Sequence, residues 1–110
     1  MQIVARAIQG WTILDLSGDI DLANSPAMRK ALLGEIKEKR TPRVFLNLKN
    51  VRYIDSSGIA SLVEGLKASR DLGSRLILYG LSKTVREVMQ LSRLQKIFEI
   101  YEDEEQALAS

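Results

Sequence analysis

Short apolar runs alternate with amphipathic segments along this chain, and that alternation limits the folds open to it. The runs Val44 to Leu48 and Arg75 to Tyr79 are rich in large apolar residues and short enough to be buried strands. Between them, apolar residues recur at the spacing of one helix face, at Ile59, Leu62, Val63 and Leu66. Strands that alternate with helices in this way favour parallel neighbours joined by right-handed crossovers.

The flanking regions supply the remaining elements. The runs Ile3 to Ile8 and Trp11 to Leu16, separated by Gln9-Gly10, predict an antiparallel hairpin. Ser25 or Asn24 is expected to cap a first helix. A third helix is expected near Lys83, and a short strand and a last helix at residues 98–101 and 103–109. We therefore predict one α/β domain over residues 1–110. Its sheet is expected to be mixed, mostly parallel, with about four to five strands, an N-terminal hairpin and about four helices.

The composition limits the kinds of catalysis and metal binding that the chain can support. The sequence has no cysteine and no histidine, which excludes disulfides and thiol catalysis and removes the commonest general base and metal ligand. It also lacks a run of about eighteen apolar residues and the basic-then-apolar order of a secretory signal. We expect a cytoplasmic protein without membrane insertion, metal or cofactor. Its 16 basic and 14 acidic residues are interleaved, so direct nucleic-acid binding is not expected.

The tetrapeptide Asp55-Ser56-Ser57-Gly58 stands where an apolar run gives way to a helix. A carboxylate and two hydroxyls at a helix start lie near unpaired backbone N–H groups, which suits them to capping or to carrying a phosphate. Of the two serines, Ser56 is expected to be the better placed to cap. Gly58 leaves no side chain over the Ser57 hydroxyl, or it relieves a tight turn.

A second polar segment, Gly18-Asp19-Ile20-Asp21, is expected to form the loop between the second strand and the first helix. Functional groups of such sheets gather in the loops beyond the strand ends. Asp19 and Asp21 are therefore candidates to hydrogen-bond a partner's backbone or to orient a nucleotide-bound metal on a partner. As an alternative, both are solvated turn residues.

With GDID after a strand and YIDSSG opening a helix, the sequence resembles a STAS domain of the anti-sigma factor antagonist family. The resemblance covers nearly the whole chain, although Ile59-Ala60 stands where Leu-Gly often follows the signature glycine. It implies that Ser57 is a phosphorylation site, that Asp21 lies beside it, and that Gly80-Leu81-Ser82 forms the turn before the third helix. The expected partner surface comprises Asp19, Asp21, Asp55, Ser56 and Gly58.

The same resemblance implies a bacterial switch in transcription regulation. The unmodified protein would bind a kinase-type anti-sigma factor with a histidine-kinase-like ATPase fold and release its client. That partner would phosphorylate Ser57, binding would be lost, and a serine phosphatase would reset the serine. We therefore expect a regulatory binding module and not an enzyme.

Three other interpretations remain open at this point. A constitutive STAS scaffold subunit of a signalling or transporter complex would use the same fold without the switch. An enzyme would use Ser56 or Ser57 as a nucleophile activated by a lysine such as Lys83, but the sequence has no histidine and no G-x-S-x-G motif. A receiver-like domain would need an early acidic pair for magnesium, and Asp55 is followed by serines.

Overall fold

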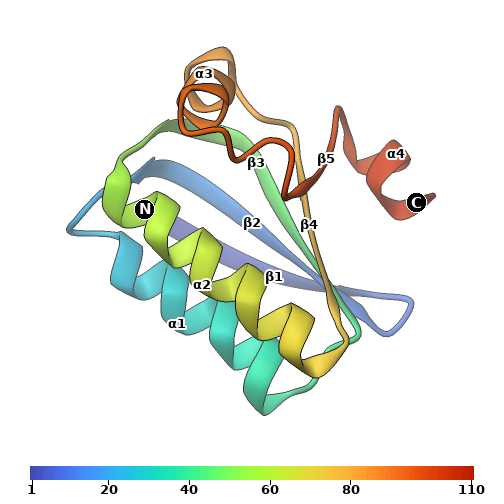
Figure 1. Ribbon diagram of the computed structural model, residues 1–110. Helices are drawn as coiled ribbons and strands as arrows, with labels where there is room; N and C mark the ends of the chain where they lie inside the picture. Colours follow the sequence, from blue (N-terminus) through green and yellow to red (C-terminus); the bar gives the residue numbers. More distant parts are fainter.

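A five-stranded sheet in the order β1-β2-β3-β4-β5 organises the molecule (Figure 1). The computed structural model describes residues 1–110. The first two strands, β1 (Gln2–Ile8) and β2 (Trp11–Ile20), pair antiparallel. The other three, β3 (Arg43–Ile54), β4 (Arg75–Tyr79) and β5 (Glu99–Tyr101), each run parallel to their neighbour. The predicted mixed sheet with an N-terminal hairpin is confirmed.

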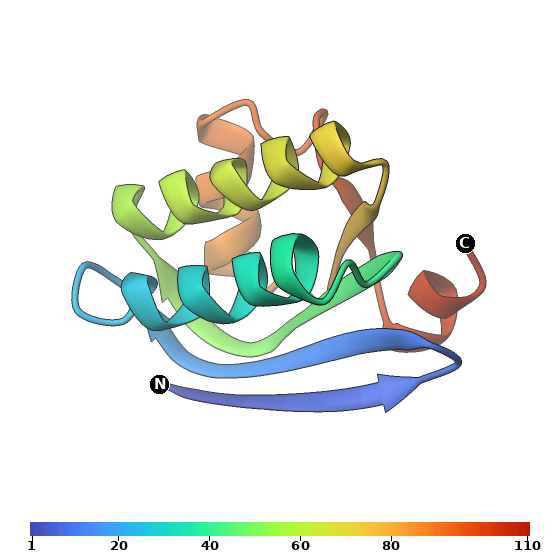
Figure 2. The ribbon, with the colours of Figure 1, turned by 90° about the horizontal axis from the view of Figure 1, so that it is seen from below.

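Three helices cover one face of the sheet and a short fourth covers the other (Figures 1 and 2). The helices α1 (Ser25–Leu33) and α2 (Ser56–Leu72) lie side by side, and α3 (Lys83–Leu91) packs beside them against β3. The last helix, α4 (Glu104–Leu108), packs against β4 and β5. One irregularity was not predicted: α1 continues as a π-helical segment, η1 (Gly34–Glu38).

The core lies mainly between the sheet and the three helices. Of the side chains that the periodicity placed on one face of the second helix, Leu62 and Leu66 are buried and Ile59 and Val63 are partly buried. Met28 and Leu32 of α1 are fully buried opposite them. A smaller cluster fills the opposite side under α4, comprising Ile13, Phe45, Ile77, Tyr79 and Ala107. Both faces of β4 and of the first half of β3, Val44 to Leu48, are therefore covered, as the continuous apolar runs predict. None of the helices is both long and apolar enough to traverse a lipid bilayer.

Strands β2 and β3 extend further than the sequence predicts. The expected loop at residues 18–21 is still strand as far as Ile20, where Gly18 pairs with Val51 and Asp19 with Tyr53. The ladder shifts register twice here, between Asp15 and Ser17 and between Gly18 and Asp19. Such bulges break the two-residue alternation by which a strand is recognised, so the segment looks like a loop in the sequence.

The β1–β2 hairpin closes through a tight two-residue turn. Gln9 and Gly10 have positive φ angles of 54° and 81°, and Ile8 pairs directly with Trp11. Two successive positive φ angles define a type I′ turn, whose twist matches that of the flanking strands. The register then runs without a shift to Gln2 opposite Ser17, so β1 is a regular edge strand.

Candidate functional site

The predicted site residues gather where β2 and β3 end and α1 and α2 begin. Because these strands run parallel, their carboxyl ends meet at the same edge of the sheet. The backbone N–H of Asp55 donates to the carbonyl of Ile20 over 3.1 Å, which fixes the exit of β3 to the end of β2. The structure thus brings Asp21, Asp55, Ser56 and Ser57 to one end of the molecule.

Asp55 is the N-cap of α2, and both of its carboxylate oxygens are occupied. Oδ1 accepts hydrogen bonds from the backbone N–H of Ser57 (2.9 Å) and Gly58 (3.1 Å) and from the Ser57 hydroxyl (2.5 Å). Oδ2 accepts from the backbone N–H of Leu22 over 3.2 Å. These donors, the Ser57 hydroxyl first, hold the pKa of Asp55 below its ordinary value. The carboxylate therefore ties the start of α2 to the loop before α1.

The expectation that Ser56 caps the helix is wrong. Asp55 precedes the helix in an extended conformation (φ −105°, ψ −173°), whereas Ser56 is already its first helical residue. A carboxylate in the N-cap position reaches two orphan amides, which a side chain one residue later does not. Ser56 is consequently exposed, while Ser57 is half-buried with its hydroxyl bound to Asp55.

Gly58 has a different role from the one expected. A Cβ at this position would lie 2.7 Å from side-chain atoms of both Ile20 and Ile54 and 2.8 Å from the Ile20 carbonyl oxygen. The glycine is buried and lets the first turn of α2 pack directly on the ends of β2 and β3. Internal packing is therefore what requires the glycine, and its place on the partner surface stays a prediction.

Asp21 organises the start of α1. Its side-chain Oδ1 accepts from the backbone N–H of Asn24 (3.0 Å), and its carbonyl accepts from that of Ser25 (2.7 Å). The Asn24 side chain, predicted as a cap, instead donates to the carbonyl of Asp19. Asp19 itself belongs to β2 and lies 3.5 Å from the Nε of the exposed Arg52. Only Asp21 is thus in the predicted loop.

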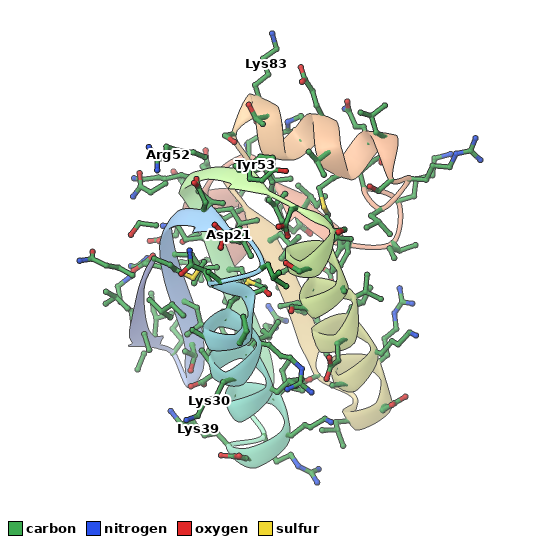
Figure 3. All side chains as sticks on the ribbon, turned by 90° about the vertical axis from the view of Figure 1, so that its left-hand side faces the viewer. Asp21, Lys30, Lys39, Arg52, Tyr53 and Lys83 are labelled. Atoms are coloured by element: carbon green, nitrogen blue, oxygen red, sulfur yellow. The ribbon has the colours of Figure 1, made fainter.

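Two exposed apolar side chains, neither of them predicted from the sequence, lie near Asp55. Leu22 is 77% exposed and Tyr53 is 46% exposed. Leu22 follows Asp21 and donates its backbone N–H to Asp55, while Tyr53 and Asp21 lie at the same end of the molecule (Figure 3). Strand periodicity gives no signal for Tyr53, because it stands two residues after the buried Val51 and would be expected on the same face.

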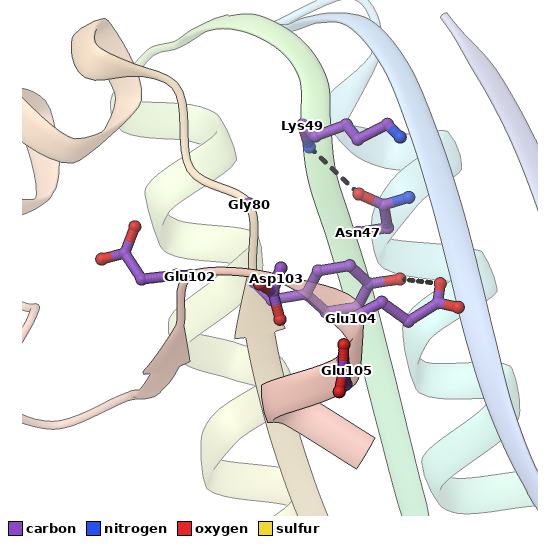
Figure 4. A pocket seen from close by; sticks show the side chains of 8 residues that line it. Asn47, Lys49, Gly80, Glu102, Asp103, Glu104 and Glu105 are labelled. Atoms are coloured by element: carbon purple, nitrogen blue, oxygen red, sulfur yellow. Dashed lines mark hydrogen bonds between the residues drawn. The ribbon is translucent and has the colours of Figure 1, made fainter. Parts of the chain in front are cut away.

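The largest pocket lies elsewhere and contains none of the predicted site residues. Its volume is about 500 Å³, and Asn47, Lys49, Tyr79 and Gly80 line it together with the acidic residues 102–105 (Figure 4). The Tyr79 hydroxyl donates to Glu104 over 2.7 Å, and burial raises the pKa of the tyrosine. No three carboxylates converge there as metal ligands. We find no chemistry for this pocket beyond its internal hydrogen bonds.

Comparisons with known proteins show the family and the fold of this chain. The family model of the STAS domain matches residues 2–107. An anti-sigma F factor antagonist of Paenibacillus polymyxa is 29% identical over 108 residues, covering 98% of this chain and 92% of the relative. A Thermotoga maritima crystal structure matches with a TM-score of 0.91 at 24% identity over 97% of this chain and 92% of that one. The Bacillus cell fate determinant SpoIIAA in its phosphorylated form matches with a TM-score of 0.75 at 21% identity over 98% and 97%. These structures confirm the predicted fold.

Proposed function

The chain belongs to the STAS domain family, and from that membership we propose that it is an anti-sigma factor antagonist switched by phosphorylation of Ser57. In its unmodified form it binds a kinase-type anti-sigma factor with a histidine-kinase-like ATPase fold. The partner transfers a phosphoryl group to Ser57 and then dissociates. A serine phosphatase restores the free hydroxyl, and both reactions take place in the cytoplasm. The chain itself supplies a substrate and a binding surface, and no catalysis.

One observation carries the assignment of Ser57 as acceptor. Its hydroxyl is held 2.5 Å from a carboxylate oxygen of Asp55, at the second position of a long helix. A nucleophile held in one position reacts more readily than a freely rotating one, because its orientation is already fixed. Ser56 is exposed and its hydroxyl makes no hydrogen bond within the chain, so it lacks this positioning.

The same hydrogen bond explains why phosphorylation changes the surface. Phosphorylation replaces the hydroxyl proton with a group of about −1.5 to −2 charge. The new dianion lies beside the Asp55 carboxylate, and the nearest helix amides already donate to that carboxylate. The helix N-terminus favours the charge by about 1 kcal/mol, so the fold survives. Asp55 repels it, so the phosphate points outward, where it meets the partner.

The surface around Ser57 suits a protein partner. The exposed Leu22 and Tyr53 supply apolar area, and Asp21 and Ser56 supply polar groups around them. An apolar centre with a polar rim is the usual anatomy of a protein interface. A phosphate placed within such a surface lacks a prepared counter-charge and disfavours association.

The test is phosphorylation by the kinase-type anti-sigma factor of the host organism. Wild type, Ser57→Ala and Ser56→Ala proteins are incubated with that kinase and ATP, and phosphopeptides are mapped by mass spectrometry. We expect phosphate on Ser57 in the wild type and in Ser56→Ala, and none in Ser57→Ala. Equal phosphorylation of Ser57→Ala at Ser56 contradicts the assignment.

A further inference from the structure

The outer edge of β1 carries no other strand (Figure 2). Edge strands are usually protected against pairing with another chain by lysine, proline, a bulge or a covering segment. β1 has none of the first three: its sequence is QIVARAI, and its register with β2 runs without a shift. Its single charge, on Arg6, is bound by Asp15 and Glu104 on the α4 side of the sheet.

The backbone groups that point outward can be assigned from the hairpin. In an antiparallel ladder, directly opposed pairs alternate between those that exchange hydrogen bonds and those that do not. A two-residue type I′ turn makes its flanking pair, Ile8 and Trp11, a hydrogen-bonded one. Arg6, Val4 and Gln2 then also bond to β2, so the N–H and C=O groups of Ile3, Ala5 and Ala7 face away from the sheet.

These outward positions are self-complementary. If two copies of β1 pair antiparallel about an axis at Ala5, Ile3 of each copy lies opposite Ala7 of the other, and Ala5 opposite Ala5. Each of these pairs can exchange both backbone hydrogen bonds. On the other face, Val4 lies opposite Arg6, so no like charges are opposed. The small alanine side chains at the centre leave room for two backbones to meet.

On the face of the sheet that α1 covers, the β1 edge also carries charges of both signs that could pair between two copies. A groove of about 410 Å³ runs between β1 and α1, with Ala5 and Gly34 among its lining residues. Lys30 and Glu38 line the same groove, about one helical turn before and after Gly34. Neither Lys30 nor Glu38 forms an ion pair within the chain. Lys39, which lines the same groove, is already bound to Glu35. An axis at Ala5 brings Lys30 of one copy toward Glu38 of the other on both sides.

We propose that two copies of this chain associate through antiparallel pairing of their β1 strands, with Lys30–Glu38 ion pairs across the joined grooves. The two sheets then become one continuous sheet, with both sets of α1 and α2 helices on the same face. The Ser57 end of each copy stays free, because it lies at the ends of β2 and β3 and not on the β1 edge. Dimerisation is therefore independent of the proposed phosphorylation.

The decisive experiment uses opposite charges at the symmetry axis. Ala5→Asp and Ala5→Lys each place two like charges opposite one another in a dimer, while an equal mixture of the two places opposite charges there. Sedimentation equilibrium over a concentration series is expected to show a wild-type dimer, at least about tenfold weaker association for each variant alone, and recovery in the mixture. Ala5 is exposed, so both variants should retain the wild-type circular dichroism.

The helix charges provide a second, independent measurement. Lys30→Glu and Glu38→Lys alone are expected to weaken the dimer, and the double exchange Lys30→Glu with Glu38→Lys to restore it. Ala5→Ser, a neutral control, should leave the dimer unchanged. A wild-type protein that stays monomeric at every concentration overturns the proposal. So does a mixture of Ala5→Asp and Ala5→Lys that associates no better than either variant alone.

Discussion

Two helices begin at the same end of the sheet and are capped in different ways. At α1, Asp21 lies three residues before the N-cap Asn24 and binds only backbone groups of its own turn. At α2, Asp55 occupies the N-cap itself and binds two amides of its helix, the Ser57 hydroxyl and the Leu22 amide of the other loop. The Asp21 carboxylate binds only within its own turn, whereas the Asp55 carboxylate connects the loops that precede the two helices. A change at Ser57 therefore acts on a residue that holds the site together.

The largest expected effect on stability comes from the packing beneath the second helix start. Gly58→Ala adds a Cβ within 2.7 Å of Ile20 and Ile54, so the helix must shift or these side chains must move. Overpacking of this kind costs about 1–3 kcal/mol, and we expect a decrease in the free energy of unfolding in that range. Chemical denaturation monitored by circular dichroism measures it.

Gly34→Ala is the matched control. A Cβ at Gly34 meets nothing within 4 Å, and its backbone is helical (φ −60°). There, alanine is expected to be neutral or to stabilise by about 0.4–1 kcal/mol. If both glycine variants lose the same stability, the close contact at Gly58 is not what the site depends on.

The second prediction concerns the pH dependence of Asp55. Its pKa is lower in the folded protein, so its contribution to stability is fully present above the unfolded pKa of about 3.9 and is lost as the pH falls below that value. Asp55→Asn should lower the melting temperature at neutral pH, and its difference from the wild type should shrink in acid. A difference that is constant between neutral pH and strong acid contradicts the assignment of the carboxylate as the ionised cap.

The third prediction tests the apolar part of the proposed interface. Leu22→Ser removes an exposed side chain beside Asp55 and should weaken binding to the anti-sigma factor at least about fivefold, roughly 1 kcal/mol, with little change in stability. Leu72→Ser, at the far end of α2, should bind like the wild type. Isothermal titration calorimetry against the same partner compares the two, and equal losses would remove Leu22 from the interface.

The fourth prediction compares Asp21 with Asp55, the carboxylate at the other helix start. Asp21→Ala removes one hydrogen bond to the Asn24 amide, which typically costs about 0.5–1 kcal/mol. Its effect on the melting temperature should be smaller than that of Asp55→Ala, while partner binding or phosphate transfer decreases. An equal or larger loss of stability at Asp21 would erase the distinction between the two helix starts.

Much of the fold was predictable because burial imposes a simple pattern. The buried faces of α1 and α2 follow from helical periodicity, and the continuous apolar runs of β3 and β4 follow from their cover on both sides. The extension of β2 through Gly18 was not predictable, since two register shifts conceal its alternation. Nor was the π-helical segment η1, whose hydrogen bonds leave no clear signal in the sequence.

The helix start that carries the candidate site was located correctly, but the capping residue was not. The sequence places Asp55, Ser56 and Ser57 at a helix start, because short polar residues after an apolar strand mark such a point. Which residue caps depends on where the helix begins, and sequence patterns do not fix that boundary to one residue. The contact of Gly58 with Ile20 joins residues far apart in the chain, so it needs the folded structure.

The central claim is that charge on Ser57 abolishes partner binding without disturbing the fold. Calorimetric titration of wild type, Ser57→Ala and Ser57→Asp against the same kinase-type anti-sigma factor tests it most directly. We expect Ser57→Asp to bind at least about tenfold more weakly than the wild type, a difference of about 1.4 kcal/mol, with unchanged circular dichroism. Ser57→Ala should bind like the wild type. Equal affinities for all three proteins would contradict the switch and favour a constitutive STAS scaffold.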